Sequence, residues 1–159
     1  MRQSHEKLFP IFLTGKVVHG KALGRTVGMP TANIEVADKH LLPECGVYAT
    51  HVLVEGKKYL AVTNIGLRPT VDQEQQVTVE AHILDFDQDI YGQSVELDVH
   101  KFLRPIRKFT SLEEVQKQVE KDIEKIYGIS AWEFLKRWYG VYDYLSSLNF
   151  FVLELKKEE

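Results

Sequence analysis

The first two thirds of the chain carry the hydrophobic pattern of β-strands. Val95, Leu97 and Val99 alternate with polar residues, the period of two that is typical of a half-buried strand. Five other segments are rich in β-branched and aromatic residues and are separated by turn signals. They cover residues 11–19, 32–36, 47–55, 58–65 and 77–86. Six short strands with little helix between them predict a mainly β fold, either an antiparallel barrel or a sandwich.

Helical periodicity replaces this pattern after Thr110. Ser111 followed by Glu114 is a capping-box sequence, which predicts a helix start, and Gly128 is the predicted helix end. Between them, apolar residues recur at the spacing that places them on one helix face. They are Leu112, Val115, Val119, Ile123 and Ile126.

A second capping box, Ser130 with Glu133, predicts another helix over an aromatic-rich extension. We expect this extension, residues 129–159, to pack on the barrel and to form one compact unit with residues 1–128, the barrel and its first helix. A surface for a partner protein is the alternative. Residues 148–155 read as a last strand, a helix end or a frayed tail.

Composition restricts the classes of protein to which the chain can belong. Its 159 residues correspond to about one domain. A net charge of −3 and a pI near 6.1 argue against a protein that coats nucleic acid. Because Cys45 is the single cysteine, neither an intrachain disulfide nor a cysteine-rich zinc site can form. The chain shows neither a long apolar run nor a signal-peptide pattern, so we expect a cytoplasmic protein.

The segment 15–33 concentrates residues that suit phosphate binding. It contains four glycines, including Gly20, and the cations Lys16, Lys21 and Arg25. Glycine lets backbone amides approach a phosphate closely, and cations offset the phosphate charge. A Walker-type loop is rejected, because Ala22 stands where that loop needs a hydroxyl. A glycine-rich connection without a ligand is the alternative.

Thr31 and Asn33 form a candidate metal site. In an extended chain they point to the same side, which brings a hydroxyl and an amide oxygen together. Mg²⁺ prefers hard oxygen ligands and often takes the others from water and nucleotide phosphates. Two neutral ligands therefore suit a metal ion that arrives with a nucleotide. A Thr/Asn pair that serves only a turn is the alternative.

Glu80 is the candidate general base. It lies within the predicted strand 77–84, on the face opposite to Val79 and Ala81. A carboxylate within reach of an attacking alcohol accelerates a reaction by roughly 10²–10⁴. A solvated surface glutamate is the alternative.

Four cations fall within eight residues just before the first predicted helix. They are Lys101, Arg104, Arg107 and Lys108. The cluster indicates either an anion site or a solvated loop.

Residues 24–33 closely resemble the signature of the riboflavin kinase family. They read G-R-T-V-G-M-P-T-A-N, against a family pattern of roughly G-R-x-x-G-x-P-T-A-N. Similar family segments follow in the expected order at 43–48, 64–70, 79–86, 91–92, 103–105 and 108–109. The resemblance covers about residues 14–127, and several motifs in one order are far more specific than a single one.

The resemblance implies a fold and a reaction. Members of the family are six-stranded antiparallel Greek-key β-barrels with a C-terminal helix. They transfer the γ-phosphoryl group of ATP to the ribityl 5′-hydroxyl of riboflavin, which gives FMN and ADP. We therefore expect an enzyme that uses ATP, riboflavin and a divalent metal, Mg²⁺ or alternatively Mn²⁺ or Zn²⁺.

The resemblance also implies roles for individual residues. Thr31 and Asn33 are expected to contact the metal–nucleotide complex, and Glu80 matches the catalytic glutamate. The other matched positions lie at the ATP phosphates, along the nucleotide site and in a flap over the flavin. They are Gly20 and Arg25, then Ile83, Asp85 and Tyr91, then Arg104, Arg107 and Phe109.

The chain departs from the family pattern in two ways. Ile106 stands where many relatives carry an acidic residue, which alters the hydrogen bonding of the flap, and Met29 replaces a commoner phenylalanine or isoleucine. Fourteen residues precede Gly15, too few for the adenylyltransferase domain to which most bacterial members are fused. We therefore expect a stand-alone or excised kinase module that stops at FMN.

Two other functions compete with the kinase. A flavin-binding regulatory module without turnover is favoured by Ile106 and the aromatic extension, and disfavoured by the intact Thr31, Asn33 and Glu80. A nucleic-acid-binding barrel is disfavoured by the negative charge and by the lack of a basic-aromatic stripe. We expect a monomer with small-molecule partners, and neither nucleic acid nor membrane.

Overall fold

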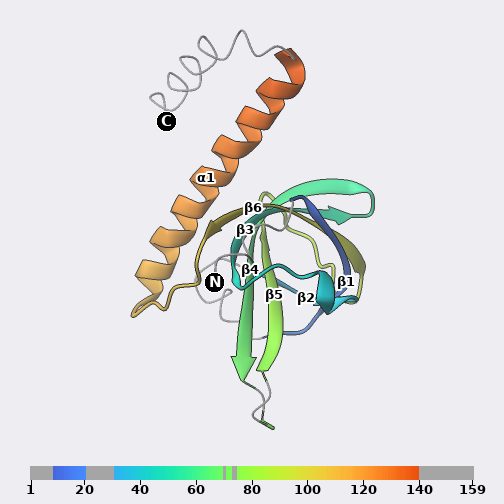
Figure 1. Ribbon diagram of the computed structural model, residues 1–159, viewed down its shortest axis with the longest axis vertical. Coiled ribbons are helices and arrows are strands. Elements are labelled where there is room, and N and C mark those ends of the chain that lie inside the picture. Colours follow the sequence, from blue (N-terminus) through green and yellow to red (C-terminus); the bar gives the residue numbers. More distant parts are fainter. Residues whose placement is uncertain (1–8, 21–30, 70, 73–74, 140–159) are drawn as a thin grey trace.

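The computed structural model of the chain describes residues 9–20, 31–69, 71–72 and 75–139. Within these ranges the elements follow a simple order (Figure 1). They are β1 (Ile11–Val18), β2 (Ala32–Val36), the 3-10 helix η3 (Lys39–Leu41), β3 (Gly46–Val54), β4 (Lys57–Pro69), β5 (Gln75–Ile83), β6 (Ser94–Arg104) and α1 (Leu112–Tyr139). The strand predictions are confirmed, with boundaries that differ most at the ends of β4, β5 and β6.

The strands form a closed antiparallel barrel in the order β1-β2-β5-β4-β3-β6. β3, β4 and β5 make a meander, and β2 and β6 return to lie along its two edges, which is Greek-key connectivity. β1 then pairs with both β2 and β6 and closes the barrel. The structure thus confirms the six-stranded antiparallel Greek-key barrel that the family resemblance implies, and it excludes the sandwich that the strand pattern alone left open.

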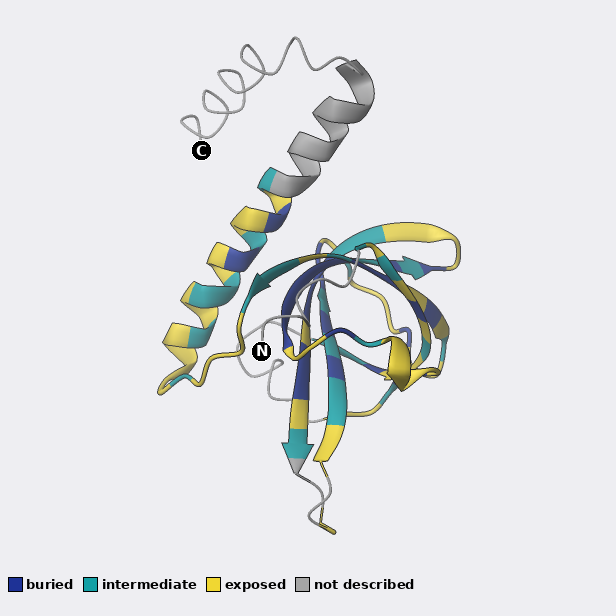
Figure 2. Ribbon diagram, in the orientation of Figure 1, coloured by how far each residue is buried: buried dark blue, intermediate teal, exposed yellow. Residues whose placement is uncertain are grey.

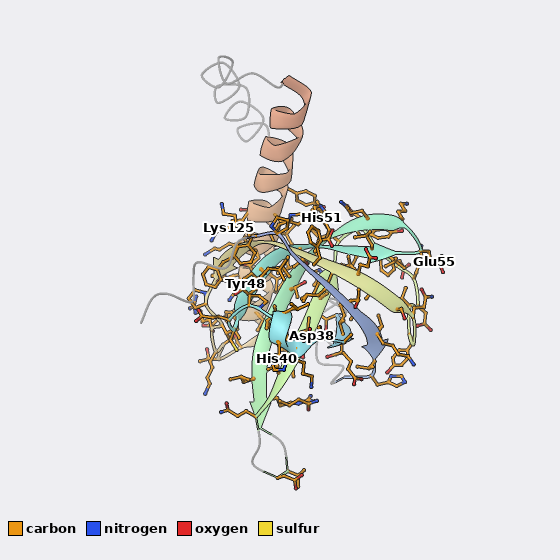
Figure 3. The ribbon with its side chains drawn as sticks, turned by 45° about the vertical axis from the view of Figure 1, so that its right-hand side comes forward. Asp38, His40, Tyr48, His51, Glu55 and Lys125 are labelled. Carbon is orange, nitrogen blue, oxygen red and sulfur yellow. The ribbon has the colours of Figure 1, made fainter. Side chains whose placement is uncertain are left out.

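Alternate side chains of the strands fill the barrel interior. The core includes Leu13, Ile34, Val52, Ile65, Val79, Ala81 and Leu97, each at most 5% exposed. Tyr48 also projects into this interior (Figure 3), where its hydroxyl donates to the backbone oxygen of Glu44 at 2.6 Å. Because Val79 and Ala81 point inward, Glu80 between them points to the outer face of the barrel.

The turn between β3 and β4 has the geometry that a two-residue hairpin requires. Glu55 and Gly56 have φ angles of 51° and 79°. Positive φ at both central positions is the type I′ turn, whose twist matches that of the flanking strands.

α1 begins at the predicted capping box. The backbone N–H of Glu114 donates to Ser111 Oγ at 3.2 Å. The Glu114 carboxylate reaches back to Thr110, accepting from its backbone N–H and its hydroxyl at 3.0 Å each. These bonds lower the pKa of Glu114.

The first half of α1 covers one side of the barrel wall. Ile126 is 1% exposed and lies with Ile123 against apolar side chains of the outer face, among them Val47, Val62 and Leu84. Figure 2 shows buried residues on the side of α1 toward the barrel and exposed ones on the other side. The predicted apolar face is therefore confirmed in part: Ile126 is buried, and Val115, Val119 and Ile123 are half-buried. Leu112, in the first turn of α1, is 58% exposed. Among the described residues, no helix has the length and apolar character needed to cross a membrane.

The predicted helix end at Gly128 was wrong. α1 continues without interruption to Tyr139, through the second capping box at Ser130, so no separate helix starts there. Glycine inside a helix costs about 1 kcal/mol relative to alanine, but it keeps its backbone N–H and does not end a helix by itself. Residues 140–159 lie outside the described part of the chain.

Candidate active site

Three polar residues form a row across the outer face of the barrel. Glu80 on β5 lies directly opposite Asn33 on β2 and Asn64 on β4. Directly opposed residues of an antiparallel sheet project from the same face. The predicted general base and the predicted metal ligand Asn33 are therefore neighbours. Asn64 belongs to the N-I-G-x-R-P-T segment, but the sequence analysis gave it no role.

Gly20 lies against the Asn33 side chain. A Cβ atom at Gly20 would overlap the Asn33 amide. The missing side chain therefore leaves the space that the Asn33 amide occupies. Thr31 immediately precedes β2, so both predicted oxygen ligands lie at its beginning. A hydroxyl and an amide oxygen beside a glycine fit a Mg²⁺ ion that brings phosphate and water ligands.

A pocket of about 200 Å³ opens beside Asn33. β2 and β5 are paired only at Ala32–Ala81 and Asn33–Glu80, and beyond these pairs the strands separate. Residues 34–36 of β2 and 76–79 of β5 line the gap. The pocket is therefore a consequence of the short β2–β5 pairing.

Two cations that the sequence analysis missed line this pocket, Lys39 and Arg68. Arg68 is half-buried and lies near the end of β4, whereas Lys39 is exposed on η3. Positive side chains beside Gly20 and Asn33 suit a phosphate ligand. Arg68 lies in the N-I-G-x-R-P-T segment, which could have indicated a functional role for it. No sequence motif pointed to Lys39. In the described part of the chain, no group of three or more His, Cys, Asp or Glu side chains forms a metal site.

Tyr91 lies in the turn before β6, which packs beside the C-terminal end of β1 near Gly20. The turn that carries it is fixed to β1 by two backbone bonds of 2.9 Å each, from Gly92 N–H to the Val17 oxygen and from Val17 N–H to the Gln93 oxygen. The Tyr91 ring contacts the His19 ring, with centroids 3.4 Å apart. His19 lines the pocket and directly precedes Gly20. Tyr91 therefore lies behind His19 and does not itself line the pocket, whereas His19, for which no role was predicted, does.

Ile83 and Asp85 lie at the other end of β5 from the pocket residues. Ile83 is 8% exposed and belongs to the barrel core. The Asp85 carboxylate accepts a hydrogen bond of 3.1 Å from the Tyr127 hydroxyl of α1. Burial and this carboxylate raise the pKa of Tyr127. These two predicted nucleotide residues are thus not brought to Gly20 and Asn33, and Arg25 lies outside the described residues.

The predicted flap is the β6–α1 connection, residues 105–111. The Arg104 and Arg107 guanidinium carbons lie 5.9 Å and 5.4 Å from the centroid of the Phe109 ring, within the range of cation–π contacts. Ile106 Cδ1 lies 3.3 Å from the position of a Cβ on Gly66, and Asn64 Oδ1 lies 3.6 Å from the same point. The β6–α1 connection therefore reaches the outer face of β4, at the Asn64 end of the polar row.

The comparison with known families is decisive. The family model Flavokinase, described as riboflavin kinase, matches residues 7–129, which is most of the chain. The chain belongs to the riboflavin kinase family. This confirms the resemblance that the motifs indicated.

Known members and solved structures agree with this assignment. The chain is 39% identical over 115 residues to the bifunctional riboflavin kinase/FMN adenylyltransferase of Bacillus subtilis. This match covers 71% of the chain but 36% of the relative, so the chain spans about a third of that protein. The riboflavin kinase of Trypanosoma brucei has a TM-score of 0.54 at 30% identity, covering 77% of this chain and 81% of that one. A Streptococcus pneumoniae structure named as a macrolide-efflux protein has a TM-score of 0.68 at 38% identity, covering 72% of this chain and 38% of that one.

Proposed function

We propose that the chain transfers the γ-phosphoryl group of ATP to the ribityl 5′-hydroxyl of riboflavin, giving FMN and ADP. The observation that carries this proposal is the register pair Asn33–Glu80 beside a pocket whose charged lining residues are Lys39, Arg68 and Glu35. Asn33 and Glu80 are neighbours in the sheet, which supports our proposal that Glu80 is the base and Asn33 a ligand of the metal–nucleotide complex. Phosphoryl transfer depends mainly on positioning and charge neutralisation, and the pocket offers both.

The nucleotide side of the site is the pocket beside Asn33. Gly20 would let backbone amides approach the phosphates, and Lys39 and Arg68 would offset their charge. Thr31 and Asn33 would hold the metal ion that accompanies ATP, for which we propose Mg²⁺. When bound, Mg²⁺ neutralises charge on the phosphate oxygens. We place Arg25 at the phosphates and the nucleoside beside Tyr91.

Glu80 is the proposed general base. As the bond between the riboflavin oxygen and the γ-phosphorus forms, the bond from that phosphorus to the bridging oxygen of ADP breaks. The proton of the attacking hydroxyl passes to the Glu80 carboxylate. Since aliphatic alcohols are poor nucleophiles at neutral pH, a base within hydrogen-bond reach contributes roughly 10²–10⁴ in rate.

The flavin side of the site is the β6–α1 connection. Arg107 is exposed and stacks on Phe109, so both can meet a flat aromatic ligand beside the polar row. Arg104 directly precedes this connection, and we assign it to the flavin side because it contacts Pro105 and Phe109. For Ile83 and Asp85 we propose an indirect role, in the barrel core and at the contact with α1.

The proposed setting is the cytoplasm, with the chain acting as a monomer on small molecules. The free, exposed Cys45 is compatible with a reducing compartment. ATP and riboflavin are the proposed substrates.

Chromatographic detection of FMN tests the proposal. The purified chain is incubated with riboflavin, ATP and Mg²⁺, and each component is omitted in turn. An FMN peak that requires all of them is the expected result. Tight riboflavin binding without FMN would replace the kinase by a regulatory flavin-binding module, and the absence of both would contradict the proposal.

A further inference from the structure

A buried carboxylate on α1 has no role in the site described so far. The Asp122 side chain is 0% exposed, on the helix face that packs on the barrel. Its carboxylate accepts from Arg104 Nε at 2.9 Å and 3.1 Å, from Arg104 Nη2 at 2.9 Å, and from Gln118 Nε2 at 3.1 Å. A buried charge pair is costly to desolvate and is often no more stabilising than an apolar contact. Stability alone is therefore a weak reason for this ion pair.

Arg104, the partner of Asp122, also contacts the β6–α1 connection. It is the last residue of β6, and its third nitrogen, Nη1, donates to the backbone oxygen of Pro105 at 3.2 Å. The guanidinium also lies over the Phe109 ring. One side chain thus links the helix, the first residue of the connection and the aromatic ring four residues further on.

The β6–α1 connection also contacts the outer face of the barrel next to the row formed by Asn33, Glu80 and Asn64. Ile106 lies against Gly66, which is paired with Thr78 on β5, two residues from Glu80. Figure 1 shows α1 running alongside the barrel wall, with the connection between its first turn and the end of β6. A shift of the Arg104 guanidinium would therefore move the connection relative to the row.

We infer that Asp122 is a positioning residue for riboflavin. Acting through Arg104, it holds the β6–α1 connection against the outer face of β4, so that Arg107 and Phe109 are in place before the flavin arrives. This inference rests on the proposed function. It concerns the riboflavin side only, because the hydrogen bonds of Asp122 are to Arg104 and Gln118 and Asp122 is not one of the described residues that line the pocket.

The substitution Asp122→Asn tests the inference, because it keeps the volume and removes the charge that fixes Arg104. We expect the KM for riboflavin to rise about tenfold, while the KM for ATP stays within about twofold of the wild-type value. Glu124→Gln, an acid-to-amide change at an exposed position of the same helix, is the matched control and should leave both constants unchanged. A folded Asp122→Asn with an unchanged riboflavin KM, or with equal increases in both constants, would overturn the inference.

Arg104→Lys covers the case in which Asp122→Asn does not fold. Lysine keeps an ion pair with Asp122 but loses the planar group that joins Pro105 and Phe109. The same selective rise in the riboflavin KM is expected, and its absence overturns the inference.

Riboflavin fluorescence separates this inference from the proposed function. If the wild-type chain makes no FMN, the proposed function fails, and riboflavin affinity then decides the inference alone. Weaker riboflavin binding by Asp122→Asn than by Glu124→Gln supports it. Equal affinities, or a wild-type chain that binds no riboflavin, overturn it.

Discussion

Asn33 and Glu80 face each other in one of the two residue pairs that join β2 to β5. The two residues come from motifs 47 positions apart in the chain, and the barrel places their side chains on one outer face. Their neighbourhood is fixed by backbone register, so it does not depend on a ligand. A substitution at either residue therefore changes the chemistry of the site with little effect on the register.

Glu80→Gln should reduce kcat for FMN formation at least about tenfold, because the amide keeps the size of the side chain but cannot accept a proton. Riboflavin affinity, measured by fluorescence quenching, should stay within about twofold, since the change affects the transition state. Glu96→Gln, at an exposed position of β6, is the control for the loss of one carboxylate. Near-normal turnover of Glu80→Gln would remove Glu80 from the role of base.

Asn33→Ala should raise the KM for ATP and the Mg²⁺ requirement about tenfold, and the riboflavin KM much less. Gly20→Ala should have the same selective effect, because the added methyl group would displace the Asn33 amide. Steady-state kinetics with each substrate varied in turn give both constants. Gln75→Ala, at the exposed start of β5, is the control. An unchanged ATP dependence in both variants would contradict the metal–nucleotide role.

We expect the titration of Tyr48 to lower the free energy of unfolding at alkaline pH. Burial, together with the nearby Glu44 and Cys45, raises the pKa of Tyr48 to about 12. Between its ordinary pKa of 10 and this value, the unfolded chain has released the proton that the folded chain still holds. The free energy of unfolding therefore falls as the pH rises through this window.

Tyr48→Phe removes this titration and the hydrogen bond to Glu44. The variant should be less stable than the wild type at pH 7, by about 1 kcal/mol. The deficit should shrink between pH 10 and pH 12, the interval set by the two pKa values. Urea unfolding of both proteins across this range measures the difference, and parallel curves would contradict the prediction.

The strands could be predicted because each carries its own local pattern of alternating residues. The pairing order could be predicted only through the family resemblance, since Ile11 meets Val99 across 88 positions and no local pattern encodes that contact. The pocket escaped prediction for a similar reason. It exists because β2 and β5 separate after Asn33, which brings Arg68 and Lys39 from other elements to one place.

The candidate site also combines residues that motifs could predict with contacts that depend on tertiary packing. Motifs gave Glu80, Asn33 and Gly20, which the barrel brings together. They also gave Arg104 as a flavin contact, but its guanidinium faces Asp122, 18 residues away on a helix whose packing was unknown from sequence. Gly128 was misread because glycine is compatible with both a helix end and a helix interior.

Gly128→Ala tests the corrected reading of the helix. In a continuous helix, alanine should increase the free energy of unfolding by about 0.5–1 kcal/mol, which raises Tm by about 2–3 °C. Gly56→Ala is the contrasting control, because Gly56 has a φ of 79° and alanine there should lower Tm. A lower Tm for Gly128→Ala would argue that the helix is broken at this residue.

The short β2–β5 pairing also links the proposed catalysis to the order of folding. The β3–β4–β5 meander can form from neighbours in sequence, whereas Asn33 meets Glu80 only when β2 crosses back to β5. Contacts between distant segments require the closure of a long loop and form slowly. A partly folded chain can therefore contain most of its sheet and still lack the candidate active site. Turnover would report on the completed Greek key, and not on β-structure as such.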